Sequence, residues 1–338
     1  MNNNPQIGNL GEFRLIKLIE DLVKKKTGKK LLRDDAFFYS LKDEELDKDL
    51  ILNSDMLVSS TDVPPQMNSY QTGRKSVIMN ISDLIVKGVI PKGIIISLGL
   101  PKELKKDDFS NLIHGIIDCC MNFNLDYIGG DINETKEIII NPTIFGFKGP
   151  SAIIFRKGMK TGDILIANNR FGLTGVGFDL LLNKKSDLKG LINYERSVMS
   201  VLEPNIPGTE AFILSEHKFA TSSIDSSDGL AKSLIDLMLS NPNYGFEIDF
   251  NENLIDPEAL LYSQDYNVPL EELVFNGGEE FIHLFTIKPK SFDAVQKKVK
   301  AKGGQMFKIG RVISEEKIYF LKENKKLELK SRGFEHFK

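Results

Sequence analysis

The amino-acid sequence predicts an α/β or α+β fold that is divided between two domains. Segments whose apolar residues recur at helical spacing alternate with short apolar runs that are typical of strands. The chain has 338 residues, enough for two domains of ordinary size. A turn at residues 148–152, KGPSA, separates two alternating series, so we expect the domains to cover residues 1–149 and 150–338.

The first series begins with an amphipathic helix at residues 11–26. Its apolar residues Leu15, Ile16, Ile19, Leu22 and Val23 share one face. The segments that follow predict, in order, a strand at 55–62, a helix at 73–88, a strand at 93–101, a helix at 109–123 and a strand at 137–147. Cys120 lies on the apolar face of the helix predicted at residues 109–123, so we expect it in the core rather than in a metal site.

The second series alternates in the same way. It predicts helices near 174–183, 190–202, 208–218 and 228–240, and strands near 219–225, 245–250, 281–287, 305–313 and 317–321. The glycine-rich stretch GLTGVGF, residues 172–178, resembles a phosphate cradle, but its spacing is not that of a dinucleotide-binding motif. We interpret it as a strand-to-helix turn. No P-loop motif is present in the sequence.

Composition excludes several classes of protein. The apolar fraction is 41%, the charged fraction 27% and the net charge −3, so no broad basic surface for nucleic acid or anionic membrane is expected. No apolar stretch approaches the roughly 18 to 20 residues of a membrane span. The polar start MNNNPQIGNLGEF is unlike a signal peptide, so we expect a cytoplasmic protein.

Acidic residues stand at the ends of the predicted elements. They are Asp34, Asp35, Asp62, Asp83, Asp131, Asp225, Asp228, Glu279 and Glu280. Acids brought together by converging loops favour bound cations, and oxygen ligands without clustered His or Cys favour Mg²⁺. Since Mg²⁺ in such sites usually also binds substrate phosphates, the acids indicate phosphoryl transfer.

Two of these acids flank a strand-to-helix turn. The segment SSIDSSDGLAKSL, residues 222–234, places Asp225 and Asp228 three positions apart, just before an apolar helical pattern. Either the two carboxylates cap the helix and complement its dipole, or they hold a divalent cation. The turn by itself leaves both roles open.

Ten short motifs occur in a fixed order along the chain. They are GEF, DDA, STD, NISDL…KG, SLGLP, GGD, RKG…GD, IDSSDGL, GGEEF and RGFEHF. In this order they resemble the thiamine-monophosphate kinase family, which belongs to the superfamily of aminoimidazole-ribotide synthetase. The resemblance extends over residues 11–337, nearly the whole chain.

The resemblance implies a two-domain, synthetase-like fold. The N-terminal domain would bind ATP and Mg²⁺, its strands would form a β-barrel across a homodimer, and an α/β domain would follow. The implied reaction is the phosphorylation of thiamine monophosphate to thiamine diphosphate by ATP, by direct in-line transfer between Mg²⁺-bridged phosphates. The implied cofactor is several Mg²⁺ ions.

The resemblance also implies roles for individual residues. The expected Mg²⁺ ligands are Asp35, Ser60, Thr61, Asp62, Asp83, Asp131, Asp225 and Asp228. Of these, the residues expected to be catalytic are Asp35, Asp62, Asp83, Asp131 and Asp225. ATP would contact Gly130, Asp131, Arg156 and Ser227, and the thiamine substrate would contact Glu279 and Phe334.

The chain departs from the family's pattern mainly in its substrate-binding motifs. Arg33 replaces a glycine, Glu280 an aspartate and Ile282 a glutamate, and the loop after Asp62, VPPQMN, lacks the substrate-contacting histidine of bacterial members. Two alternatives therefore stay open. One is another ATP-using member of the superfamily, similar to aminoimidazole-ribotide synthetase. The other is a non-catalytic, nucleotide-binding regulatory protein.

Overall fold

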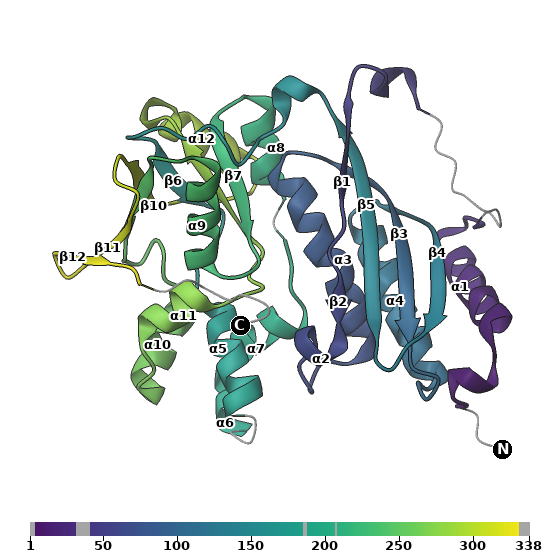
Figure 1. Ribbon diagram of the computed structural model, residues 1–338. Coiled ribbons are helices and arrows are strands. Elements are labelled where there is room, and N and C mark those ends of the chain that lie inside the picture. Colours follow the sequence, from purple (N-terminus) through teal and green to yellow (C-terminus); the bar gives the residue numbers. More distant parts are fainter. Residues whose placement is uncertain (1–3, 32–40, 185–187, 207, 331–338) are drawn as a thin grey trace. The chain divides into compact units, whose positions relative to one another are not determined.

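The computed structural model describes residues 4–31, 41–184, 188–206 and 208–330 (Figure 1). The chain forms two compact units. The N-terminal unit consists of Met1–Leu84 and Ile90–Pro150, and the C-terminal unit consists of Ile85–Val89 and Ser151–Lys338. The observed α/β architecture agrees with the fold class that the sequence predicts.

The N-terminal unit is built on a five-stranded mixed sheet. Its order is β1-β5-β3-β4, with β2 also pairing with β5. The strands are β1 (Asp49–Asn53), β2 (Leu57–Val58), β3 (Pro91–Leu100), β4 (Asp126–Glu134) and β5 (Ile139–Lys148). Strands β3 and β4 are parallel and the other pairs are antiparallel. In the described chain β1 and β4 do not pair with each other, so the sheet is open and these two strands are its edges.

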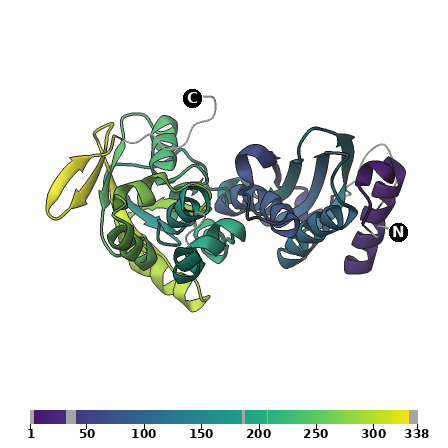
Figure 2. The ribbon, with the colours of Figure 1, turned by 90° about the horizontal axis from the view of Figure 1, so that it is seen from below.

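Helices cover one face of this sheet. The helices of the unit are α1 (Glu12–Thr27), α2 (Ser59–Asp62), α3 (Ser69–Val86, whose last two residues belong to the C-terminal unit) and α4 (Lys106–Asn122), with 3₁₀ turns η1 (Ile7–Asn9) and η2 (Asp43–Glu45). Figures 1 and 2 show α3 and α4 packed on the same face. Their apolar sides, including Ile78, Ile81, Leu112 and Ile116, are fully buried, and this burial supplies the core of the unit.

Two glycines let α3 and α4 approach closely. A Cβ added at Gly73 would lie 2.1 Å from the carbonyl oxygen of Leu112, and one at Gly115 would lie 1.9 Å from that of Tyr70. Any larger residue would therefore push the helices apart. On α4, Cys120 is buried as a free thiol, which confirms its expected core position.

The opposite face of the sheet carries no described helix of this unit. Residues that alternate with the buried ones point to this face. The register pairs Leu50 with Phe147 and Leu52 with Phe145, and the two phenylalanine rings are 6.0 Å apart. Leu50 and Leu52 are 53% and 60% exposed. We call this surface the open face.

The expected strand at residues 55–62 is only partly correct. The chain extends at Leu57–Val58 and then turns into the single helical turn α2, because Asp62 and Thr61 bond back to Val58. The sequence reasoning also missed β1, a five-residue edge strand within a polar stretch.

The C-terminal unit is built on a seven-stranded mixed sheet in the order β12-β11-β8-β10-β6-β9-β7. Its strands are β6 (Ile164–Ala167), β7 (Ala220–Ser226), β8 (Gly245–Asp249), β9 (Ile282–Ile287), β10 (Phe307–Ile313), β11 (Ile318–Lys322) and β12 (Lys325–Glu328). Among these seven strands, β8 and β11 pair in parallel and the other neighbouring pairs are antiparallel. Strand β9 is buried at every position, so the core runs through the middle of this sheet.

The helices of this unit are α5 (Leu173–Phe178), α6 (Leu188–Asn193), α7 (Glu195–Leu202), α8 (Thr209–Glu216), α9 (Leu230–Ser240), α10 (Pro257–Tyr266), α11 (Leu270–Asn276) and α12 (Phe292–Ala301). Shorter turns are η3 (Pro150–Ala152, starting at the boundary between the units), the π-helical η4 (Asp179–Asn183) and η5 (Pro289–Ser291). The sequence predicts a strand-to-helix turn at GLTGVGF, but only Gly172, the N-cap residue, precedes the helix, and the remaining six residues form α5 itself. A Cβ at Gly175 would lie 2.5 Å from the carbonyl of Leu273, so this glycine serves the packing of α5 against α11. No helix in the described ranges is both long and apolar enough to cross a membrane.

Candidate active site

Helix α2 carries three of the predicted Mg²⁺ ligands at consecutive positions. Ser60 and Thr61 are exposed and Asp62 is half-buried. Asp62 Oδ2 accepts the backbone N–H of Val58 at 2.6 Å, and Thr61 Oγ1 donates to the carbonyl of Val58 at 3.3 Å. The turn therefore holds its own side chains in place and presents oxygen donors.

Two charged residues hold α2 at its ends. Glu137 Oε2 accepts the N–H of Ser60 at 2.8 Å and the hydroxyl of Ser59 at 3.2 Å. Hydrogen bonds from these serines lower the pKa of Glu137. At the other end, the fully buried Lys75 donates from Nζ to the carbonyl of Asp62. A carboxylate at the start of a helical turn and an ammonium group at its end both interact favourably with the dipole of the turn.

Asn53 places Asp83 beside a second carboxylate. Its Nδ2 donates to Asp83 Oδ2 at 2.8 Å and to Asp55 Oδ2 at 3.1 Å. The buried Asn80 accepts the N–H of Asp55 at 2.8 Å and donates to its carbonyl at 3.0 Å. The two carboxylates together concentrate negative charge where β1 meets α3. Asp55 was missed by the sequence reasoning, although it directly precedes the apolar run of β2.

Asp131 lies on the open face, in a row of polar residues. It is exposed on β4 and pairs with Ser97 of β3, which pairs in turn with Asn141 of β5. The glycine before it has a structural reason: a Cβ at Gly130 would lie 1.8 Å from the carbonyl oxygen of Ile96. The space that a side chain at Gly130 would need is therefore occupied by the backbone of strand β3.

In the C-terminal unit, Asp225 and Asp228 lie where β7 passes into α9, as the sequence predicts. Asp225 is buried, while Ser227 is exposed and Asp228 half-buried. The N-cap residue of α9 is Gly229, which has no side chain to make a capping bond. Neither acid is the N-cap residue itself, and both roles considered for them, support of the helix start and cation binding, stay open.

The strand next to Asp225 supplies a neutral histidine. Asp225 pairs with His283 across β7 and β9. Burial and the charge of Lys87 lower the pKa of His283 to about 3. Lys87 also donates from Nζ to the carbonyl of Ser223 at 2.7 Å. A histidine that stays neutral at physiological pH adds no positive charge beside the carboxylate.

Arg156, expected to contact ATP phosphates, is exposed on a segment that runs beside β7. The N–H of Ser223 donates to the carbonyl of Phe155 at 3.0 Å. Asn241 Nδ2 donates to the carbonyl of Arg156 at 2.8 Å, and Asn241 Oδ1 accepts the N–H of Gly158 at 2.7 Å. These bonds fix the backbone of Arg156 next to Phe155, whose partner Ser223 precedes Asp225 by two residues on β7.

Two predicted contact residues are joined by a backbone hydrogen bond. The N–H of Glu279, an expected substrate contact, donates to the carbonyl of Ser227, an expected ATP contact, at 2.5 Å. The N–H of Phe281 donates to the carbonyl of Ser226 at 3.0 Å. The motifs IDSSDGL and GGEEF, which lie some fifty residues apart in the sequence, therefore form one local structure.

The predicted Mg²⁺ ligands do not form a preassembled cluster in the described parts of the chain. There, no group of three or more His, Cys, Asp or Glu side chains lies close enough to hold a metal ion. Asp35 and Phe334 lie outside the described residues, as do Asp34 and Arg33. The donor atoms of the remaining ligands are all oxygens, which suits Mg²⁺.

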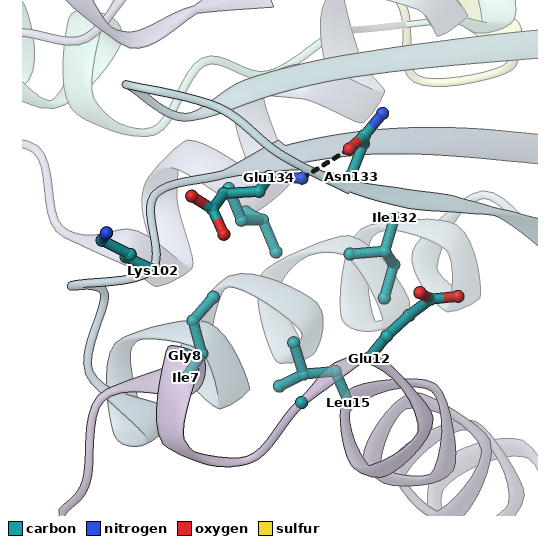
Figure 3. Close-up of a pocket in the computed structure, with 10 residues that line it drawn as sticks. Ile7, Gly8, Glu12, Leu15, Lys102, Ile132, Asn133 and Glu134 are labelled. Carbon is teal, nitrogen blue, oxygen red and sulfur yellow. Dashed lines mark hydrogen bonds between the residues drawn. The ribbon is translucent and has the colours of Figure 1, made fainter.

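A pocket of about 260 Å³ lies elsewhere in the N-terminal unit, between α1 and the ends of β3 and β4 (Figure 3). It is lined by Ile7, Gly8, Gly11, Glu12, Leu15, Leu100, Lys102, Ile132, Asn133 and Glu134. None of the predicted site residues lines it. Its wall is mixed, since the apolar side chains of Ile7, Leu15, Leu100 and Ile132 alternate with the polar ones of Glu12, Lys102, Asn133 and Glu134.

Comparison with known proteins identifies the family. Residues 33–147 match the family model of AIR synthase related protein, N-terminal domain. Thiamine-monophosphate kinase of Nitrosopumilus maritimus is 32% identical over 332 residues, which cover 98% of this chain and 100% of that protein. The chain belongs to the thiamine-monophosphate kinase family. The resemblance inferred from the ten motifs is confirmed.

Further members of the thiamine-monophosphate kinase family align over the full chain. The protein of Aquifex aeolicus is 28% identical over 337 residues, 98% of this chain and 100% of that protein. A solved structure described as AaThiL complexed with AMPPCP and TMP has a TM-score of 0.72 at 26% identity and covers 97% of this chain and 98% of that chain. Both units of the fold are therefore shared with the family.

Proposed function

We propose that the protein phosphorylates thiamine monophosphate to thiamine diphosphate with ATP as the donor. The observation that carries the proposal is membership of the thiamine-monophosphate kinase family over both units. The hydrogen bond from the backbone N–H of Glu279 to the carbonyl of Ser227 supports the proposal, because this bond joins the expected substrate contact to the expected ATP contact.

The chemistry suits a site without a general base. The acceptor is a phosphomonoester whose second pKa is about 6, so its oxygen is largely ionised at neutral pH. That oxygen forms a bond to the γ-phosphorus of ATP while the bond from this phosphorus to the β-γ bridging oxygen breaks, and ADP leaves. The neutral His283 next to Asp225 fits this scheme, since no proton has to be removed from the acceptor.

Oxygen side chains in each unit would hold Mg²⁺. In the N-terminal unit these are Asp35, Ser60, Thr61, Asp62, Asp83 and Asp131, and in the C-terminal unit Asp225 and Asp228. When bound, Mg²⁺ would neutralise the charge of two polyanions and hold their phosphates in line. Glu137 and Lys75 support this assignment because they fix the turn that carries three of the ligands.

ATP and substrate would be bound by further residues. Gly130, Asp131, Arg156 and Ser227 would contact ATP, and Glu279 and Phe334 would contact thiamine monophosphate. The fixed backbone of Arg156 and the exposure of Ser227 support the nucleotide contacts. We place the ATP- and Mg²⁺-binding and dimerisation domain in residues 1–149, and the α/β domain, which would add the ATP contacts of Arg156 and Ser227, in residues 150–338.

The open face supports assembly as a homodimer. It presents Leu50, Leu52 and Phe147 on a sheet whose other face is already covered by α3 and α4. Exposed sheet edges and apolar faces favour association with a second copy. A β-barrel formed by the sheets of two subunits would cover this surface.

The experiment that tests the proposed function compares acceptors. Release of ADP from ATP is measured with Mg²⁺ alone, with thiamine and with thiamine monophosphate. We expect release that depends on thiamine monophosphate and on Mg²⁺. If the protein binds ATP tightly but releases no ADP with either thiamine or thiamine monophosphate, the result would favour one of the two alternatives. These are the non-catalytic regulatory protein and the protein similar to aminoimidazole-ribotide synthetase.

A further inference from the structure

The loop at residues 277–281 has a strained backbone. Glu279 has φ +60° and Phe281 has φ +49°, which places two residues other than glycine in the left-handed region. Such residues cost free energy and persist only where surrounding contacts impose the conformation. The bonds from Glu279 and Phe281 to the carbonyls of Ser227 and Ser226 restrain one side of the loop.

Glu280 restrains the other side. Its side chain reaches the start of α5, where Oε1 accepts the N–H of Gly172 at 2.7 Å and the N–H of Thr174 at 3.4 Å. Gly172 is the N-cap residue of α5 and has no side chain of its own to cap the helix. A residue 108 positions away in the sequence therefore satisfies these helix-terminal donors.

We propose that Glu280 is a positioning residue for the substrate contact Glu279, because its carboxyl group ties the 277–281 loop to the start of α5. The proposal rests on the proposed function and deepens it. With Ser226 and Ser227 on one side and α5 on the other, the loop is held at two places. Glu279, between them, has a single backbone conformation from which to meet the substrate.

The surroundings of Glu280 favour a lasting contact between its carboxyl group and the start of α5. The carboxyl oxygen Oε2 is enclosed and makes no hydrogen bond within the described structure, and the hydroxyl of Thr174 is enclosed in the same way. Burial raises the pKa of Glu280 to about 8, and the carboxylate of Asp256 contributes, although bonds from Gly172 and Thr174 act in the opposite direction. Arg196 pairs with Asp256 at 2.6 Å. The neutral form of Glu280 is thus favoured at pH 7, and neutrality makes its burial less costly.

The length of the Glu280 side chain suits this contact. Glu280 Oε1 lies 2.7 Å from the amide nitrogen of Gly172, so the present side chain just spans the distance to α5. Aspartate is shorter by one methylene and cannot make the same bond without movement of the strained loop. Glutamine has the same length and retains an acceptor oxygen.

Three variants test the proposal: Glu280→Gln, Glu280→Asp and Glu280→Ala. We expect Glu280→Ala and Glu280→Asp to raise KM for thiamine monophosphate by roughly tenfold or more and KM for ATP by less than about threefold. Glu280→Gln should restore KM for thiamine monophosphate to near the wild-type value. Glu252→Ala, which removes an exposed carboxylate of the same unit, is the matched control.

Hydrogen exchange supplies a readout that does not depend on turnover. The amides of Gly172 and Glu279 should exchange faster in Glu280→Ala than in the wild type, and Glu280→Gln should restore their protection. Equal changes in both KM values with a lowered Tm would overturn the proposal in favour of a general structural role. Unchanged protection in Glu280→Ala would also overturn it. The wild type could form no thiamine diphosphate while the amides of Gly172 and Glu279 still exchange faster in Glu280→Ala. In that case the proposed function would be wrong, but the contact of Glu280 with α5 would stand.

Discussion

Glu137 Oε2 accepts the backbone N–H of Ser60 at 2.8 Å, so a carboxylate in the loop between β4 and β5 holds the turn that carries three predicted Mg²⁺ ligands. Residues that orient metal ligands typically change metal affinity by 10- to 100-fold when they are removed. We therefore expect Glu137→Ala to raise the Mg²⁺ concentration for half-maximal activity roughly tenfold. The measurement is a Mg²⁺ titration at saturating substrates, with Glu103→Ala as control. Superimposable titration curves for the two variants would refute the role.

The turn between β7 and α9 gives a second prediction. Because Gly229 is the N-cap, Asp225→Asn and Asp228→Asn should not weaken α9, whereas each removes a negative charge from the cation site. We expect turnover to fall by roughly 10² or more with little change in Tm. Raised Mg²⁺ should partly restore Asp228→Asn. Variants that keep more than about half of the wild-type turnover would exclude these acids from the metal site.

A third prediction follows from the buried carboxyl of Glu280, whose pKa is raised to about 8. In the unfolded chain this group releases its proton near pH 4.5, whereas the folded protein retains it. Its stabilising contribution is therefore complete below about pH 4.5 and is lost as the pH rises to about 8. Relative to Glu280→Gln, the wild type should lose stability steadily over this window and no further above it. Urea midpoints of both proteins at pH 5.5, 7 and 8.5 test this, and parallel pH profiles would contradict it.

The open face predicts how assembly can be broken. Leu52 is 60% exposed on β1 and pairs with Phe145 on the same surface. A charge at this position would be buried in a dimer interface, so Leu52→Glu should sediment as a monomer at micromolar concentration. Leu239→Glu, at a position that is 76% exposed on α9, should leave the assembly unchanged. A monomeric wild type would contradict the dimer altogether.

Strong local patterns explain what the sequence predicted well. Helix α4 has apolar residues at regular helical spacing, and the expected positions of α3, α4 and β7 agree with the structure to within a few residues. Helix α10 was missed because its pattern is misleading: Leu260 and Leu261 are exposed while Ala259 and Tyr262 are buried. Helix α12 was missed because only Val295 and Val299 contribute to the core.

The contacts that fix the site could not be found from local patterns. Asn53 and Asp83 are 30 residues apart, Ser60 and Glu137 are 77 apart, and Glu280 reaches a helix start 108 residues away. These pairs depend on tertiary structure. One signal was nevertheless present: Lys75 lies three residues before Ile78, on the apolar face of the predicted helix, and a lysine there indicates a buried, bonded ammonium group.

Transfer of a labelled phosphoryl group tests the proposed reaction most directly. The protein is incubated with Mg²⁺, thiamine monophosphate and ATP labelled at the γ-phosphate, and the products are separated. We predict that the label appears in the terminal phosphate of thiamine diphosphate, in an amount equal to the ADP formed. Label in free phosphate, or ADP formed without thiamine diphosphate, would contradict direct transfer to thiamine monophosphate.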